Sequence, residues 1–93
     1  MPNVTETQTG IFEFSCPLTI STEKWINEHL DCDAIIDNLG STIVVYAFTR
    51  EPQYNYALER YKKKKNYLKQ HILRGISSDG LNRRRCPQCR GRE

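Results

Sequence analysis

Residues 11–20 alternate between apolar and other side chains, which is the pattern of a half-buried strand. The apolar positions are Phe12, Phe14, Cys16, Leu18 and Ile20. Pro17 has no amide hydrogen to donate to a neighbouring strand. We therefore predict a strand that lies at a sheet edge, or that is paired on one side only around Pro17. The polar residues 1–9 before it predict a flexible N-terminus.

A short helix is predicted after this strand. Ser21-Thr22-Glu23 offers hydroxyl groups for an N-cap and an acid for the first turn. Apolar and aromatic residues then recur at helical spacing as far as about Asp31. They are Trp25, Ile26, His29 and Leu30.

Residues 33–40 allow two interpretations. The helix either continues to a cap at Gly40, or the chain forms a β-hairpin whose turn is Asp37–Gly40. Apolar and β-branched residues flank the turn residues on both sides, which favours the hairpin. Thr42–Phe48 is apolar at nearly every position. That strand should be buried on both faces and therefore be central.

A long helix is predicted from about Gln53 to Arg74, ending at Gly75. Its apolar stripe is Tyr54, Leu58, Tyr61, Leu68 and Ile72. Lys62–Lys65 point in nearly every direction around the helix axis. The helix therefore either projects past the core or lies across it, with the aliphatic parts of the lysine side chains along the core and their ammonium groups in solvent. Residues 76–93 contain few apolar side chains, which predicts a linker followed by a basic tail with a CxxC motif.

Taken together, these elements predict a small single-domain α+β fold. It contains an edge strand, a short helix, a β-hairpin or second strand, a long basic C-terminal helix, and an Arg/Cys-rich tail. The ordered domain is expected over residues 10–75. A mean hydropathy of −0.68 and the lack of an apolar run of about 18–20 residues exclude a membrane-spanning helix.

The four cysteines have neither the density nor the flanking turns of a secreted disulfide framework. The N-terminus also lacks the apolar stretch of a secretory signal. We therefore expect an intracellular protein of the cytoplasm or nucleus, in which thiols or a bound metal are favoured over disulfides.

Charge is distributed very unevenly along the chain. Residues 1–59 contain two basic and nine acidic side chains, for a net charge of −7, whereas residues 60–93 contain twelve basic and two acidic ones, for +10. Such asymmetry indicates either a half that meets a polyanion or charge pairing within or between chains.

The basic half predicts binding to nucleic acid, DNA or RNA, because clustered Lys and Arg neutralise phosphates. The candidate residues are Arg60, Lys62, Lys63, Lys64, Lys65, Lys69, Arg74, Arg83, Arg84, Arg85, Arg90 and Arg92. Four tyrosines precede or interleave with them and offer stacking surfaces for unpaired bases. They are Tyr54, Tyr56, Tyr61 and Tyr67. The competing interpretation is an ordinary solvated helix face.

Cys86-Pro87-Gln88-Cys89 is a chelating motif, but structural zinc needs four ligands. One completion adds His29 and Cys32, which lie at i and i+3 on one face of the predicted helix. In a second, Cys16 substitutes for one of these ligands, and a third joins two chains through their Cys86 and Cys89 thiols. The alternatives to zinc are a redox pair and a tail with unused thiols. A redox pair is disfavoured because hardly any chain remains after Cys89 to form the usual helix.

The sequence CPQCRGRE resembles one repeat of the cysteine-rich zinc domain of DnaJ-type chaperones, whose pattern is CxxCxGxG. It departs from that pattern at Glu93, where the family has glycine. The resemblance covers eight residues and the other repeats are missing, so it carries no function to this chain.

No catalytic constellation stands out, and we predict that the chain is not an enzyme. Asp31, Asp33 and Asp37 are explained as turn residues. The leading hypothesis is a small regulatory protein that binds nucleic acid through its basic helix and tail. The alternative is a protein-interaction module, such as a viral or regulatory inhibitor, that docks its basic end on an acidic partner. The charge asymmetry also leaves a homodimer open.

Overall fold

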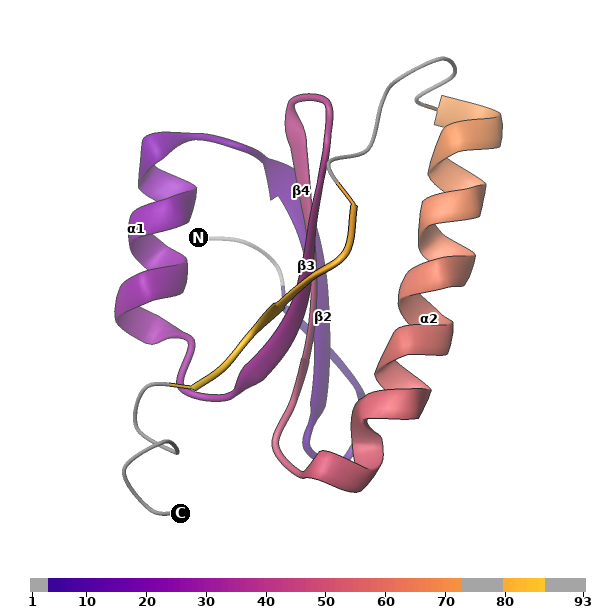
Figure 1. The fold of residues 1–93 in the computed structure, drawn as a ribbon. Coiled ribbons are helices and arrows are strands. Elements are labelled where there is room, and N and C mark those ends of the chain that lie inside the picture. The colour runs from indigo at the N-terminus through magenta and orange to yellow at the C-terminus, as the bar shows by residue number, and fades with distance from the viewer. Residues whose placement is uncertain (1–3, 73–79, 87–93) are drawn as a thin grey trace.

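The computed structural model describes residues 4–72 and 80–86. Within these residues five strands form one antiparallel sheet in the order β1-β2-β4-β3-β5, with one helix on each face (Figure 1). The elements are β1 (Thr5–Gln8), β2 (Ile11–Pro17), α1 (Ile20–His29), β3 (Asp33–Leu39), β4 (Thr42–Phe48), the 3-10 turn η1 (Glu51–Gln53), α2 (Tyr54–Tyr67), the π-helical turn η2 (Leu68–Ile72) and β5 (Asn82–Arg84). The predicted α+β class is confirmed.

The connections explain why the helices lie on opposite faces of the sheet. The β2–α1–β3 and β4–α2–β5 units each join two parallel strands with one antiparallel strand between them. Both units advance in the same direction across the sheet, but they start from strands that run in opposite directions. Two crossovers of the same hand must then place their helices on opposite faces, as Figure 1 shows.

The central strand β4 contributes to both of the resulting cores. Val44, Tyr46 and Phe48 pack toward α2, and the residues between them pack toward α1. The α2-side core also contains Ile11, Ile35, Leu39, Ala57, Tyr61 and Leu68. The α1-side core contains Phe14, Ile26, Cys32, Ala34, Ile43, Val45 and Ala47. The prediction that Thr42–Phe48 is central and buried on both faces is therefore confirmed.

The hairpin interpretation of residues 33–48 is also confirmed, with a tighter turn than predicted. Leu39 pairs with Thr42, so only Gly40 and Ser41 form the loop. Gly40 has a φ of 65°, a conformation that glycine adopts without steric cost. The turn therefore lies at the C-terminal end of the predicted Asp37–Gly40 segment.

The strand around Pro17 is paired on one side, as one of the two predicted alternatives requires. All of β2 pairs with β4, but β1 reaches only Ile11–Glu13. The following helix begins earlier than predicted, because its N-cap is Thr19 and not a residue of the segment Ser21-Thr22-Glu23. The Thr19 hydroxyl accepts a hydrogen bond from the Thr22 amide at 3.1 Å.

The structure differs from the sequence prediction at both ends of the described chain. β1 lies within residues 1–9, and β5 lies within the segment 76–93 that was expected to be a linker and tail. Neither strand has an alternating apolar pattern that would predict it from the sequence. Each is held in place by backbone pairing with a longer strand: β1 pairs with β2, and β5 pairs with Ala34–Ile36 of β3. The long helix follows its predicted course as α2 and η2, and its predicted end at Gly75 lies outside the described residues.

In the described part of the chain, no helix combines the length and the apolar character that crossing a membrane requires.

Candidate nucleic-acid interface

Much of the charge asymmetry is used inside the fold. Every ion pair between distant parts of the described chain joins an acid from residues 1–59 to a base from residues 60–93. These pairs are Glu13–Arg60, Asp37–Lys65, Asp33–Arg83, Glu51–Arg83, Asp33–Arg85 and Glu51–Arg85. The acidic and basic halves are therefore partners within one domain, which was one of the alternatives left open by the sequence.

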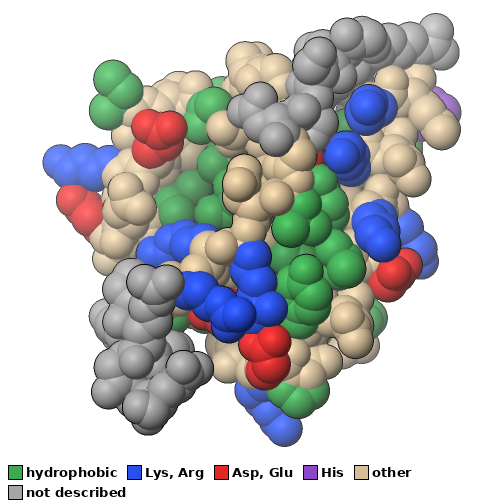
Figure 2. Space-filling model, viewed as in Figure 1, with side chains coloured by type: hydrophobic (Ala, Val, Ile, Leu, Met, Phe, Trp, Pro, Cys, Tyr) green, Lys and Arg blue, Asp and Glu red, His purple; other side chains and the backbone are tan. Residues whose placement is uncertain are grey.

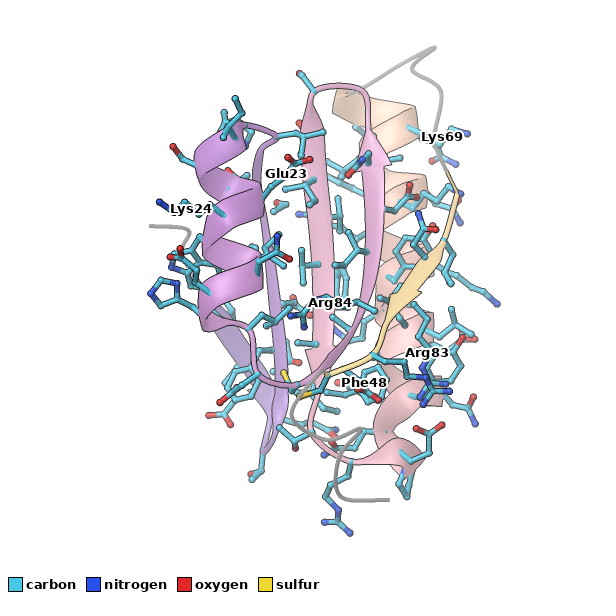
Figure 3. All side chains as sticks on the ribbon, turned by 60° about the vertical axis from the view of Figure 1, so that its left-hand side comes forward. Glu23, Lys24, Phe48, Lys69, Arg83 and Arg84 are labelled. Carbon is cyan, nitrogen blue, oxygen red and sulfur yellow. The ribbon has the colours of Figure 1, made fainter. Side chains whose placement is uncertain are left out.

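Arg83 on β5 is held on several sides. Its guanidinium lies 4.4 Å from the ring centroid of Tyr54 and 5.4 Å from that of Phe48, and it donates a hydrogen bond to Glu51. That hydrogen bond raises the pKa of Arg83 above its usual range. Figure 3 shows Arg83 and Phe48 at the same end of the sheet. Because only 21% of its side chain is exposed, Arg83 mainly fastens β5 to the start of α2.

The neighbouring arginines are also engaged. Arg84 donates to the carbonyl oxygen of Cys32 at 3.2 Å, and Arg85 lies 3.8 Å from carboxylates on two other elements, at Asp33 and Glu51. Figure 2 shows acidic side chains beside the basic group over β5, and a second group of basic side chains along α2 at the right. The arginines of β5 are therefore primarily contacts that hold the last strand in place.

Two basic residues of α2 also pair with acidic side chains of the sheet. Arg60 donates two hydrogen bonds, at 2.9 and 2.8 Å, to the carboxylate of Glu13 on β2, and this pairing raises its pKa. Lys65 Nζ lies 3.9 Å from the fully buried carboxylate of Asp37. Asp37 also accepts a 2.6 Å hydrogen bond from the Tyr61 hydroxyl, whose pKa is raised by burial and then by that hydrogen bond.

The remaining lysines of α2 and η2 are Lys62, Lys63 and Lys69, which are exposed, and Lys64, which is half-buried. We call these four residues the basic strip. Lys62 has a solvent-exposed pair with Glu59 at 3.9 Å, a type of contact that contributes little. Among the described residues, no ion pair joins Lys63, Lys64 or Lys69 to an acid. This strip is the part of the predicted interface that is still available to an external anion.

An exposed aromatic ring lies beside Lys64. The Tyr67 side chain is 52% exposed, with Lys64 Nζ at 6.0 Å from its ring centroid and the His71 ring at 5.0 Å. The other three candidate tyrosines are less available. Tyr61 is buried, Tyr54 lies under Arg83, and Tyr54 and Tyr56 both pack against the α2-side core. Tyr67 is therefore the candidate best placed to stack on an unpaired base.

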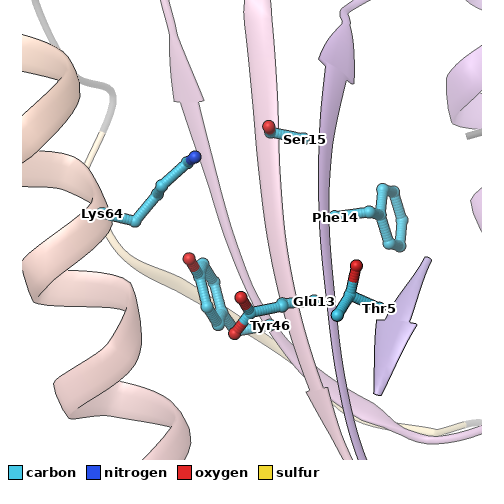
Figure 4. A pocket seen from close by; sticks show the side chains of 6 residues that line it. All are labelled: Thr5, Glu13, Phe14, Ser15, Tyr46 and Lys64. Carbon is cyan, nitrogen blue, oxygen red and sulfur yellow. The ribbon is translucent and has the colours of Figure 1, made fainter. Parts of the chain in front are cut away.

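Lys64 also lines a small polar cavity of about 180 Å³ between α2 and the edge of β2 (Figure 4). Hydroxyl groups from Thr5, Ser15 and Tyr46 share the lining with the carboxylate of Glu13. Burial, followed by the charge of Glu13, raises the pKa of Tyr46 to about 12, so its phenol stays protonated at neutral pH. Since Arg60 pairs with Glu13, the cavity offers an ammonium group and three hydroxyl groups, which together suit a phosphate oxygen.

The predicted zinc ligands are only partly brought together. Cys32 and Cys86 are both buried at one corner of the domain, whereas Cys16 lies on β2 against α1. His29 is the last residue of α1, so Cys32 lies beyond the helix rather than on one helical face with it. The His29 ring is exposed and stacks on Trp25 with centroids 5.4 Å apart. Among the described residues, no group of three His, Cys, Asp or Glu side chains is arranged to hold a metal.

Several predicted residues lie outside the described residues: Arg74, Cys89, Arg90 and Arg92. Conversely, the cavity beside Lys64 was missed by sequence reasoning. Thr5, Ser15 and Tyr46 carry ordinary hydroxyl groups in separate segments, and only strand pairing brings them together. The pairing of Arg83 with acids of its own chain had one signal in the sequence, the excess of acidic side chains in residues 1–59.

Comparison of the chain with protein-family models, with curated proteins and with solved structures finds no match.

Proposed function

We propose that this chain binds single-stranded nucleic acid along the exposed side of α2. The observation that carries the proposal is the position of Lys64, which lies over the exposed Tyr67 ring and also lines the hydroxyl-rich cavity. One nucleotide can then stack its base on Tyr67 while its phosphate meets Lys64. The rest of the basic strip supplies counterion release along the strand.

The proposal specifies a single strand because the site offers a ring face. A base within a duplex is already stacked on its neighbours, whereas an unpaired base gains about 1–3 kcal/mol from an aromatic platform. His71, tilted by 43° against Tyr67, widens that platform. A regulatory role in the cell is part of the same proposal.

The alternative, docking of the basic end on an acidic protein, receives less support from the geometry. Arg83 on β5 and Arg85 next to it, which it would need, already contact acids of their own chain. An external acidic surface would have to displace these contacts, whereas a nucleic acid strand on α2 would leave them intact.

The test is fluorescence anisotropy with labelled single-stranded and duplex oligonucleotides of equal length over a salt series. We expect the single strand to bind more tightly, with a logarithmic salt slope of about −3 if the four lysines of the strip contact phosphates. Tyr67→Ala should weaken single-strand binding on the order of tenfold, whereas Tyr67→Phe, which keeps the ring, should bind like the wild type.

Lys64→Gln should weaken binding and reduce the salt slope by about 0.7. Its matched control is Lys24→Gln, which makes the same change of charge on α1. α1 and α2 lie on opposite faces of the sheet (Figure 3). Equal losses in the two lysine variants would contradict a site on α2 and indicate a response to net charge alone. Absence of binding at low salt by the wild-type chain would overturn the proposal.

A further inference from the structure

The small polar cavity beside Lys64 is built on one row of residues across the sheet. Thr5 on β1 pairs with Glu13 on β2, and Glu13 pairs with Tyr46 on β4. Residues directly opposite each other in adjacent strands carry their side chains on the same face, so the row faces α2, as Tyr46 does in the α2-side core. Ser15 lies two positions beyond Glu13 on the same face of β2, past the end of the pairing with β1. Strand register therefore brings the three hydroxyl groups of the cavity together.

The Tyr46 hydroxyl is the clearest sign that the cavity has a ligand. Tyr46 is only 4% exposed, and among the described residues no hydrogen bond joins its hydroxyl to another group. The hydroxyl end of the ring lies on the side of Lys64 (Figure 4). Because burial raises the pKa of Tyr46 to about 12, the hydroxyl keeps its proton at neutral pH and can donate it. A buried tyrosine usually has a partner for its hydroxyl, and an acceptor oxygen in the cavity would supply one.

The charges at the cavity favour an anion. The carboxylate of Glu13 already accepts two hydrogen bonds from Arg60, at 2.9 and 2.8 Å, so the ammonium group of Lys64 is the charge left for a ligand. The three hydroxyl groups add donors around it. A phosphate monoester presents three strong acceptor oxygens and a charge of about −1.5 to −2 at pH 7. An internal phosphodiester has only two free oxygens and one negative charge, so it would leave more of these donors unused.

The size of the cavity also favours the end of a strand. Its volume of about 180 Å³ is below the roughly 300 Å³ at which pockets for drug-sized ligands begin, so it suits a phosphate group better than a nucleoside. An internal phosphate has a nucleoside on both sides, whereas a terminal phosphate has only one, which can lie over Tyr67 beside Lys64.

We propose that this cavity binds a phosphate monoester, and that on nucleic acid this group is the terminal phosphate of a single strand. The phosphate site stands on the cavity alone, whereas its occupation by the end of a strand rests on the proposed function. The two parts are therefore tested separately.

Inorganic phosphate tests the cavity without nucleic acid. The full-length chain, isotopically labelled for NMR, is titrated with inorganic phosphate and, as a control, with sodium chloride to the same ionic strength. We expect the amide signals of Ser15 and Tyr46 to shift saturably with phosphate and to stay unchanged with chloride. No shift with phosphate, or equal shifts with both salts, would overturn the inference.

Oligonucleotides with different ends test the ligand. Single strands of one sequence, each with an internal fluorophore, carry a phosphate at the 5′ end, a phosphate at the 3′ end, or hydroxyl groups at both ends. We expect one phosphorylated strand to bind on the order of tenfold more tightly than the hydroxyl-ended strand, which identifies the end that enters the cavity. Equal affinities for all three strands would overturn the inference and leave the proposed function intact. Binding of none of them, together with the phosphate-dependent NMR shifts, would overturn the proposed function and leave the phosphate site.

Two variants show whether the preference for a phosphorylated end arises in the cavity. Tyr46→Phe removes a hydroxyl that has no hydrogen-bond partner among the described residues, so the fold should be retained, and the urea midpoint checks this. In Tyr46→Phe and in Ser15→Ala, the ratio of the affinities for the phosphorylated and the hydroxyl-ended strand should fall toward one. The matched control Ser21→Ala removes an exposed hydroxyl from α1 on the opposite face of the sheet and should keep the wild-type ratio. An unchanged ratio in both cavity variants would overturn the inference.

Discussion

The arginines of β5 and the lysines of α2 carry the same charge but have different surroundings. Arg83 lies over two aromatic rings and contacts two acids. Lys63 and Lys69 face solvent with no acid paired to them among the described residues. A run of basic residues in a sequence can therefore be a structural clamp or a binding surface. The position of its acidic partners in the fold decides which.

The largest expected effect comes from breaking the clamp. Arg83→Ala should lower the free energy of unfolding by about 2–4 kcal/mol, because it removes the stacking on Tyr54 and the closer of the two cations shared by Glu51 and Asp33, leaving only Arg85 beside them. Urea denaturation followed by circular dichroism measures this. Lys63→Ala is the control and should stay within about 0.5 kcal/mol of the wild type. Similar losses in both variants would contradict the distinction between clamp and surface.

The elements of the fold that could be predicted from the sequence are those whose own side chains form an apolar pattern. β4 could be predicted as central because both of its faces are apolar, and the β3–β4 hairpin followed from Gly40 between two apolar runs. β5 could not be predicted, because Asn82–Arg84 has no apolar side chain and is ordered by its pairing with β3 and by Arg83. In the candidate interface, the tyrosines and lysines could be identified as a set. Selecting Tyr67 and Lys64 required knowing which side of α2 faces the sheet.

The next largest change in stability is expected on the side of α2 that packs against the sheet. Tyr61→Phe removes the hydroxyl that donates to the fully buried Asp37 carboxylate. A buried acceptor that loses its donor costs about 1–3 kcal/mol, so the urea midpoint should fall. Tyr67→Phe is the matched control on the exposed side of the same helix and should leave the midpoint unchanged. A Tyr61→Phe variant as stable as the wild type would show that the hydroxyl is not needed to support Asp37.

Alkaline pH should destabilise the domain through a buried thiol and a buried phenol. The pKa of Cys32 is raised to about 11 and that of Tyr46 to about 12, both chiefly by burial. In the unfolded chain these groups lose their protons at lower pH than in the folded one. Their contribution to stability is therefore present below about pH 9 and is lost as the pH rises through 11 to 12. Urea midpoints measured from pH 8 to 11 should fall, and a flat profile would contradict the burial of these groups.

The smallest expected change in stability comes from a comparison of two lysines that are two positions apart on one helix. This comparison separates a structural role from a binding role most directly. Lys65 lies 3.9 Å from buried Asp37 and 5.8 Å from the Tyr61 ring centroid, whereas Lys63 faces solvent. Lys65→Gln should lower the free energy of unfolding by about 1 kcal/mol and leave oligonucleotide affinity, per folded molecule, nearly unchanged. Lys63→Gln should do the reverse, with unchanged stability and a salt slope reduced by about 0.7. If both variants lose affinity equally, α2 binds nucleic acid through its overall charge. If only Lys63→Gln does, the interface is the exposed side of the helix, and Lys65 is as structural as Arg83.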